Sequence, residues 1–71
     1  MNYKVCIRFV QNDEYIGTEP YHVEIADDTK EDEFMSALMD STREILNEEN
    51  QDNEVWQNGD VVWTLIDFEK F

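Results

Sequence analysis

The segment 29–49 has the strongest periodicity in this chain, and it limits what the chain can fold into. Apolar residues recur there at a spacing that places them on one side of an α-helix, with about 100° between successive residues. A helix of this length extends for roughly 30 Å, the width of a small domain. Because the whole chain has only 71 residues, the other segments have to cover the helix's single apolar stripe. That stripe contains Phe34, Met35, Leu38, Thr42, Ile45 and Leu46.

The segments before the helix predict two strands. Residues 3–10 alternate between apolar and polar side chains, and residues 21–26 do the same. Strict alternation is typical of a strand that buries one of its two faces. Residues 11–20, which lie between these segments, collect Asn, Asp, Gly and Pro. This composition predicts a loop or a long hairpin connection.

The segment after the helix predicts a second hairpin. The pair Asn58-Gly59 separates two β-rich runs within residues 54–68, and such a pair favours a type I′ turn. Residues 61–66 are apolar on both sides, so we expect the last strand to be central or covered on both faces. The predicted fold class is α+β, with a single ββαββ domain over residues 1–71. One long acidic amphipathic helix would pack on one face of a mostly antiparallel sheet of three or four strands.

Negative charge is concentrated on and around the predicted helix. The chain has 18 acidic and 5 basic residues, a net charge of −13. Eleven of the acids lie within residues 27–54, with only Lys30 and Arg43 as basic residues. Asp40, Glu44 and Glu48 follow one another at intervals of four, nearly opposite the apolar stripe. Like charges at this spacing destabilise a helix by about 0.2–0.5 kcal/mol per pair, and we expect Arg43 to lie off their line.

The residue inventory argues against catalysis and against a metal or cofactor site. Cys6 and His22 are the only cysteine and histidine, which are too few for a zinc site or for the usual nucleophilic arrangements. The EF-hand spacing also fails, because a loop that starts at Asn12 places Ile16 and Val23 at ligand positions. We therefore predict that the protein is not an enzyme and has no metal and no cofactor.

The same inventory limits the compartment and the classes of partner. A single cysteine cannot form an internal disulfide, which favours a reducing compartment. No segment resembles a signal peptide or approaches the roughly 20 apolar residues of a membrane span. The negative charge argues against anionic membranes and against direct binding of nucleic acid. We expect a soluble protein in the cytoplasm of a bacterial host cell.

The line of carboxylates on the helix predicts a surface that binds a basic partner. Carboxylates four residues apart rise by about 6 Å along a helix, a pitch that can face cations arranged to grip a phosphate backbone. We predict that the partner is a basic nucleic-acid-binding protein, such as a nuclease, whose nucleic-acid site is blocked. The predicted contact residues are Glu33, Asp40, Glu44, Glu48, Glu49, Asp52 and Glu54. Possible extensions of the surface are Asp13, Glu14, Glu19 and Trp56.

In size, charge and compactness the chain resembles small acidic phage proteins that mimic DNA. Examples are anti-CRISPR, anti-restriction and uracil-DNA glycosylase inhibitors. These proteins share no common fold, so the resemblance implies an inhibitor without assigning residues. Two alternatives stay open at this point. One is an immunity protein or antitoxin that neutralises a basic nuclease toxin. The other is a structural or adaptor module with a merely solvated acidic face, and either a monomer or a homodimer is compatible with the sequence.

Overall fold

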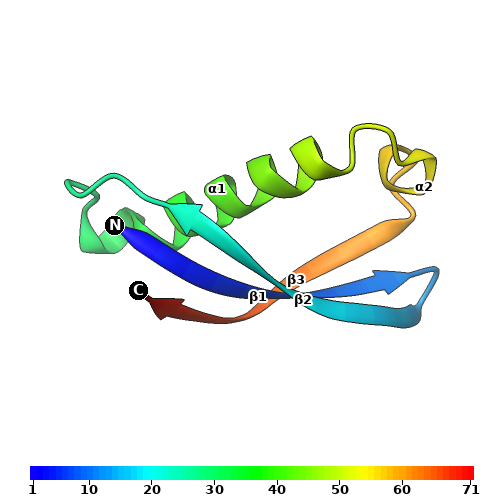
Figure 1. Ribbon diagram of the computed structural model, residues 1–71, viewed down its shortest axis with the longest axis horizontal. Helices are drawn as coiled ribbons and strands as arrows, with labels where there is room; N and C mark the ends of the chain where they lie inside the picture. The colour runs from blue at the N-terminus through cyan, green and yellow to red at the C-terminus, as the bar shows by residue number, and fades with distance from the viewer.

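The fold is a three-stranded antiparallel sheet with one long helix lying across it, as Figure 1 shows. The computed structural model describes all residues from Met1 to Phe71. The strand order is β2-β1-β3. The elements are β1 (Asn2–Gln11), β2 (Glu14–Glu24), the 3₁₀ turn η1 (Glu31–Glu33), α1 (Phe34–Glu49), α2 (Glu54–Gln57) and β3 (Val61–Lys70). The α+β class and the antiparallel sheet with a helix on one face are confirmed, whereas the ββαββ order is wrong because there is no fourth strand.

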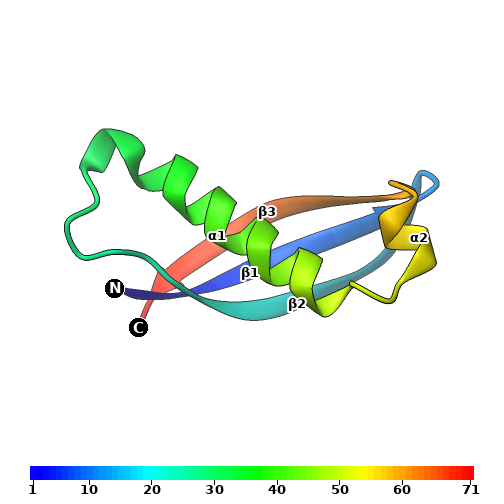
Figure 2. The same ribbon diagram turned by 90° about the horizontal axis from the view of Figure 1, so that it is seen from above.

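The core lies between α1 and the central strand β1, and α1 crosses the sheet diagonally (Figure 2). The predicted alternation of β1 is confirmed, because Tyr3, Val5 and Ile7 are buried while Lys4 and Arg8 are exposed. Only 8 of the 71 residues are fully buried, so the stability of the fold rests on a very small set of contacts. These residues are Tyr3, Val5, Ile7, Val23, Ile25, Leu38, Thr42 and Leu46.

The helix begins slightly later than predicted. The 3₁₀ turn η1 starts at Glu31 and runs directly into α1, so the helical segment covers residues 31–49 rather than 29–49. Thr42 is the one buried polar residue, and its hydroxyl group donates a hydrogen bond of 2.7 Å to the carbonyl oxygen of Leu38. This bond satisfies the hydroxyl inside the apolar stripe, which explains how a threonine is accommodated there.

The predicted loop over residues 11–20 is mostly strand. Only Asn12 and Asp13 form the turn between β1 and β2, with φ angles of 50° and 67°. Two positive φ angles in a two-residue connection are the requirement of a type I′ turn, which matches the twist of the flanking strands. Asparagine and aspartate tolerate this conformation better than most other residues. The Gly and Pro residues that suggested a loop, Gly17 and Pro20, lie within the edge strand β2.

The predicted strand at residues 54–57 is instead the short helix α2. Asn53 caps this helix, because its side-chain oxygen accepts a hydrogen bond from the backbone N–H of Trp56 at 3.3 Å. The pair Asn58-Gly59 therefore leads from a helix into β3 and does not close a hairpin. Within this pair Asn58 has a φ of −77° and only Gly59 has a positive φ, 80°. That angle suits the residue after a helix C-terminus.

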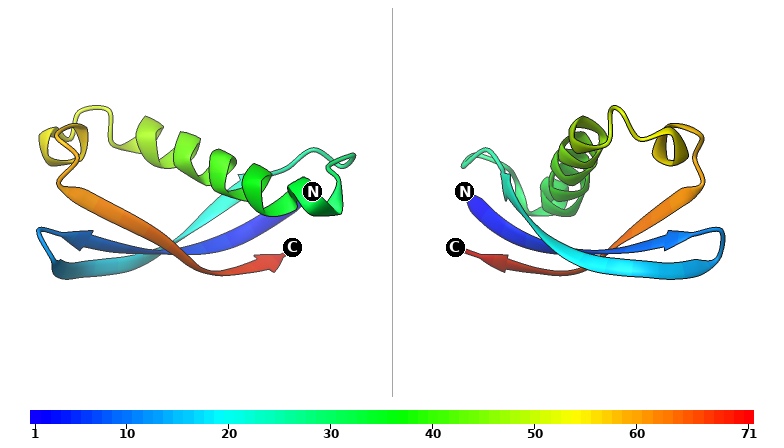
Figure 3. Two further views of the ribbon diagram at one scale, coloured as in Figure 1. Left: turned by 180° about the vertical axis from the view of Figure 1, so that it is seen from behind. Right: turned by 45° about the vertical axis from the view of Figure 1, so that its right-hand side comes forward.

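The last strand was predicted to be central, but it forms one edge of the sheet. Val61, Trp63 and Leu65 are partly buried, and Trp63 and Leu65 pack against the core, whereas Val62 and Ile66 are 62% and 51% exposed. The register with β1 shifts between Cys6 and Ile7. Figures 1 and 3 show both helices on one side of the sheet and nothing on the other. We call this uncovered side the outer sheet face.

Candidate partner-binding surface

The carboxylates of α1 that were predicted to contact a partner point away from the sheet. Leu38, Thr42 and Leu46 form the buried side of α1. Since about 100° separates successive residues, Asp40, Glu44 and Glu48 lie on the opposite side, and all three are exposed. We call these three residues the acidic helix face. Glu33, at the beginning of α1, lies roughly 22 Å from Glu48 along the helix axis.

The acidic helix face is partly neutralised at one position by Arg43, although Arg43 itself lies off the carboxylate line, as predicted. The Nη1 atom of Arg43 donates a hydrogen bond of 3.0 Å to the Oδ1 atom of Asp40. The guanidinium carbon of Arg43 also lies 5.8 Å from the centre of the Trp63 ring. The long side chain of Arg43 therefore reaches back to the carboxylate line from a neighbouring row of the helix. Glu44 and Glu48 have no ion pair.

The two ends of the helical segment differ in how well they suit acidic residues. Glu31, Asp32 and Glu33 occupy the first turn, where negative side chains interact favourably with the helix dipole. Glu33 therefore has a local structural role that is independent of any partner. The last turn of α1 contains no basic residue, and it carries Glu48 and Glu49, which the dipole disfavours there. Unlike the acids of the first turn, Glu48 and Glu49 are therefore not stabilised by the helix dipole.

Further predicted contact residues gather at the same end of the molecule as the C-terminus of α1. The turn between β1 and β2 lies beside the segment after α2, where the backbone N–H of Asn12 donates to the carbonyl oxygen of Asp60 at 3.3 Å. Figure 3 shows the β1–β2 turn and α2 at one end in both views. We call this group the acidic end; its exposed members are Asp13, Glu14, Asp52, Glu54 and Asp60. Asp60 was not predicted, because it was assigned to the hairpin rather than to the surface.

The outer sheet face has a different charge pattern. Lys4 and Arg8 alternate along β1, and Lys4 lies between His22 on β2 and Glu69 on β3. Arg8 lies 5.9 Å from the centre of the Tyr15 ring. Bases and acids are thus mixed on this face, whereas the acidic helix face and the acidic end are almost entirely negative. The two sides of the molecule would attract different partners.

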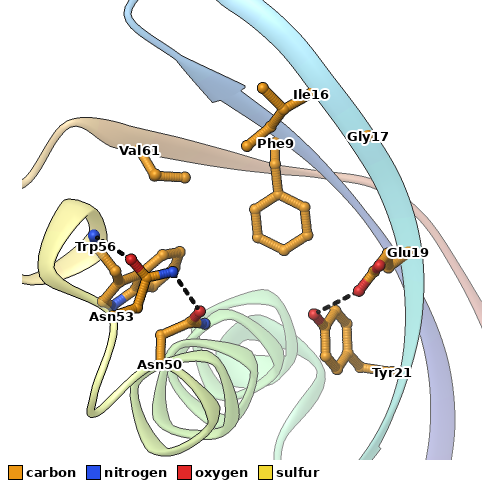
Figure 4. A pocket seen from close by; sticks show the side chains of 9 residues that line it. All are labelled: Phe9, Ile16, Gly17, Glu19, Tyr21, Asn50, Asn53, Trp56 and Val61. Carbon is orange, nitrogen blue, oxygen red and sulfur yellow. Dashed lines mark hydrogen bonds between the residues drawn. The ribbon is translucent and has the colours of Figure 1, made fainter.

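A cavity of about 210 Å³ lies between β2 and the end of α1. Figure 4 shows Glu19 and Tyr21 on one side of it, Asn50, Asn53 and Trp56 on the other, and the ring of Phe9 between them. The Tyr21 hydroxyl group donates to the Oε2 atom of Glu19 at 3.2 Å. We call this cavity the aromatic pocket; Ile16, Gly17 and Val61 complete its lining. Glu19 and Trp56, which were predicted as possible extensions of the acidic surface, therefore line a pocket and do not lie on the acidic helix face.

The electrostatic environment of the aromatic pocket is negative. Partial burial raises the pKa of Tyr21 to about 12, and the charges of Glu19 and Glu49 add to this effect. Glu49, which was grouped with Glu48 in the sequence, therefore acts on Tyr21. The reason is the 100° turn between successive helical residues, which rotates Glu49 away from the acidic helix face.

The raised pKa of Tyr21 predicts how stability changes with pH. Because the folded pKa lies above the ordinary value of 10, the unfolded chain loses this proton more readily, and stability falls as pH rises from 10 towards 12. After allowance for solvent screening of this partly exposed group, we expect a loss of about 1 kcal/mol. Urea unfolding between pH 9 and pH 12 should show this loss in the wild type and a smaller one in Tyr21→Phe. Tyr15→Phe, at an exposed tyrosine, should behave like the wild type; equal pH profiles for all three proteins would contradict the prediction.

Known proteins offer no direct guide to the use of these surfaces. Comparisons with known protein families, characterised proteins and solved structures found no match. No group of three or more His, Cys, Asp and Glu side chains is arranged to hold a metal ion. Neither helix has the length and apolar character needed to cross a membrane. The acidic helix face, the acidic end and the aromatic pocket are therefore interpreted from their own geometry.

Proposed function

We propose that this protein is an acidic mimic of nucleic acid, of the anti-defence type encoded by phages and mobile elements. It would bind a basic host protein, such as a nuclease, and block the site that normally receives nucleic acid. The observation that carries the proposal is the position of Glu44 and Glu48. Both are exposed and without an ion pair, and both weaken the helix that carries them. A cationic surface would relieve this cost on binding.

The shape of the molecule supports a mimic. Its extents are 37 × 20 × 19 Å, so it is a short rod of nearly uniform width. Exposed carboxylates lie along α1 on one side of this rod, and others lie at the acidic end. Lysine and arginine side chains that grip phosphates at intervals of a few ångströms would find carboxylates about 6 Å apart. Long-range attraction would make association fast and sensitive to salt.

The proposal is tested by capture from a bacterial lysate followed by competition. The immobilised protein is incubated with lysate, washed with nuclease to remove bridging nucleic acid, and eluted with increasing salt. We expect a nucleic-acid-binding protein to elute at high salt, and to be released by added duplex DNA or RNA when it is purified and bound again. Identification of the captured protein also separates the mimic from the immunity-protein alternative, in which the partner is a toxin encoded beside this chain's gene.

Two outcomes would contradict the mimic. One is a captured protein that holds this chain and nucleic acid at the same time, because a mimic has to occupy the nucleic-acid site. The other is a complex that is insensitive to salt, which would favour the adaptor alternative. In that case the contact would involve the outer sheet face, where Tyr15, Val62 and Ile66 are more than half exposed.

A further inference from the structure

We propose that the aromatic pocket binds the guanidinium group of an arginine side chain, which inserts between Glu19 and Trp56. This inference rests on the proposed function for the source of the arginine, which would be the basic partner. The pocket itself can be tested with a free ligand. It is a second contact, separate from the acidic helix face, and it would add recognition of a specific side chain to a general attraction between opposite charges.

Three aromatic rings from three different elements meet at the pocket. The ring centre of Phe9 on β1 lies 6.4 Å from that of Tyr21 on β2 and 6.3 Å from that of Trp56 on α2. Both pairs are edge-to-face, with interplanar angles of 77° and 65°. The face of an aromatic ring is the negative part of its quadrupole, so a cation is attracted wherever one of these rings presents its face to the cavity.

Glu19 is the only charged residue in the lining, and the structure leaves it with unused capacity. Its carboxylate accepts one hydrogen bond, from the hydroxyl group of Tyr21, whereas a carboxylate can accept about four. The two asparagines of the lining are already engaged. Asn50 donates to the carbonyl oxygen of Leu46 at 2.7 Å, and the side-chain oxygen of Asn53 accepts from the backbone of Trp56. A ligand would therefore find its strongest polar partner at Glu19.

No lysine or arginine of the chain itself fills the pocket. Arg43 lies instead over Trp63, and Arg8 over Tyr15 on the outer sheet face. The chain thus uses two of its own cations at aromatic rings elsewhere, and the pocket with three rings and a carboxylate has none. The nearby charge of Glu49 makes the site more negative still. An anion would be repelled, and a neutral ligand could gain hydrogen bonds to Glu19 but no attraction between opposite charges.

The size of the pocket favours one side chain over a larger molecule. Its volume of about 210 Å³ is below the range of about 300–1,000 Å³ that is typical of sites for drug-sized ligands. Arginine fits the lining better than lysine does. Its planar guanidinium stacks on aromatic faces and can donate two parallel hydrogen bonds to a carboxylate, whereas a lysine ammonium group is a compact and strongly hydrated charge.

The pocket is tested by titrating ¹⁵N-labelled protein with N-acetyl-arginine methylamide at constant ionic strength. The indole N–H of Trp56, which donates to the side-chain oxygen of Asn47 at 3.0 Å, is the reporter, and the indole N–H of Trp63 is the internal control. We expect a saturable shift at Trp56 and little change at Trp63. The corresponding citrulline derivative, which has the same shape without the charge, should bind at least fivefold more weakly. Equal shifts with both compounds, or equal shifts at both tryptophans, would overturn the proposal.

Glu19→Gln and Glu24→Gln form a matched pair for the role of the carboxylate. Both residues are exposed on β2, but Glu19 lies on the pocket side and Glu24 on the outer sheet face. We expect Glu19→Gln to weaken binding of the arginine compound at least fivefold and Glu24→Gln to leave it within twofold. Glu19 is chosen over Phe9 or Trp56 because both rings also pack against the core. Equal behaviour of the two variants would overturn the assignment of Glu19.

The same pair, measured with the captured partner, separates this inference from the proposed function. We expect Glu19→Gln to weaken the complex at least fivefold relative to Glu24→Gln. A pocket that binds the free compound while Glu19→Gln leaves the complex unchanged would overturn the assignment of the ligand to a partner's side chain. If the complex depends on Glu44 and Glu48 but not on Glu19, the mimic proposal is supported and the pocket has no part in the complex. If nucleic acid does not compete with this protein for the partner, the mimic proposal is wrong, but binding of arginine in the pocket is unaffected.

Discussion

Replacement of Glu44 and Glu48 by lysine is expected to weaken the complex with the basic partner by a factor of about 100 or more. Each replacement turns an attraction into a repulsion, and loss of one member of a close interfacial charge pair costs about 2–5 kcal/mol. The same double variant should be more stable alone, by about 1 kcal/mol. The first new lysine would attract Asp40 at the i,i+4 spacing, and the second would suit the negative end of the helix dipole. Asp40 is left unchanged because it already pairs with Arg43.

The matched control for this double variant is Glu24→Lys with Glu69→Lys. It changes the net charge by the same amount, but both positions lie on the outer sheet face. Binding constants at one fixed salt concentration and thermal unfolding midpoints should be measured for both double variants. We expect the affinity of the control to stay within a few-fold of the wild-type affinity. Its unfolding midpoint should not rise in the way expected for the first variant, because the carboxylates of α1 are unchanged. If the two double variants lose affinity equally, overall charge determines binding and the acidic helix face is not a recognition surface.

The sequence predicted the elements whose pattern depends on local periodicity. Segment 31–49 and β1 follow from the spacing of their apolar residues, and both were found with nearly the expected bounds. The errors lie where a local pattern has two solutions. Asn58-Gly59 suits a hairpin turn and equally suits the exit from a short helix, and Asn53 decides between them by capping α2. In the sequence alone, Asn53 could not be recognised as a helix N-cap, so the hairpin and the short helix could not be distinguished.

The position of β3 was missed for a different reason. A strand that is apolar on both sides is expected to have other elements packed on both of its faces. The apolar pattern does not show whether the chain forms enough helices or strands to pack there. Here a single long helix covers one face, and no element remains for the other. Val62 and Ile66 are exposed as a result. The charged positions along α1 could be predicted because helical spacing alone determines their direction.

The aromatic pocket could not have been predicted from the sequence. Phe9, Tyr21 and Trp56 are separated by more than ten residues each, and they meet because α1 crosses the sheet and α2 folds back over the end of β1. Arg43 was missed on a smaller scale. Its backbone position is off the carboxylate line, but its long side chain still reaches Asp40. In both cases the deciding factor is tertiary geometry or side-chain reach, neither of which periodicity describes.

Replacement of Leu38 by alanine is expected to unfold most of the protein at low salt. Leu38 is fully buried in the core between α1 and β1, and truncation of a buried leucine costs about 2–5 kcal/mol. The core of a domain this small rarely supplies more than about 3–5 kcal/mol in total. Repulsion among the exposed carboxylates lowers the remaining margin further. The expected signature is loss of helical circular dichroism and a much lower urea midpoint than in the wild type.

A control variant, Met35→Ala, and a series of salt concentrations test whether lost packing and charge repulsion together unfold Leu38→Ala. Met35→Ala shortens an apolar side chain one turn earlier in α1, but Met35 is 48% exposed, so we expect it to lose less than about 1 kcal/mol. Added salt screens the repulsion among the carboxylates, so it should restore part of the folded signal of Leu38→Ala. A Leu38→Ala protein that remains folded at low salt would show that the truncation costs less than the total stability of the fold, which would contradict the prediction. A variant that salt cannot restore at all would show that repulsion among the carboxylates is not what limits the stability of this fold.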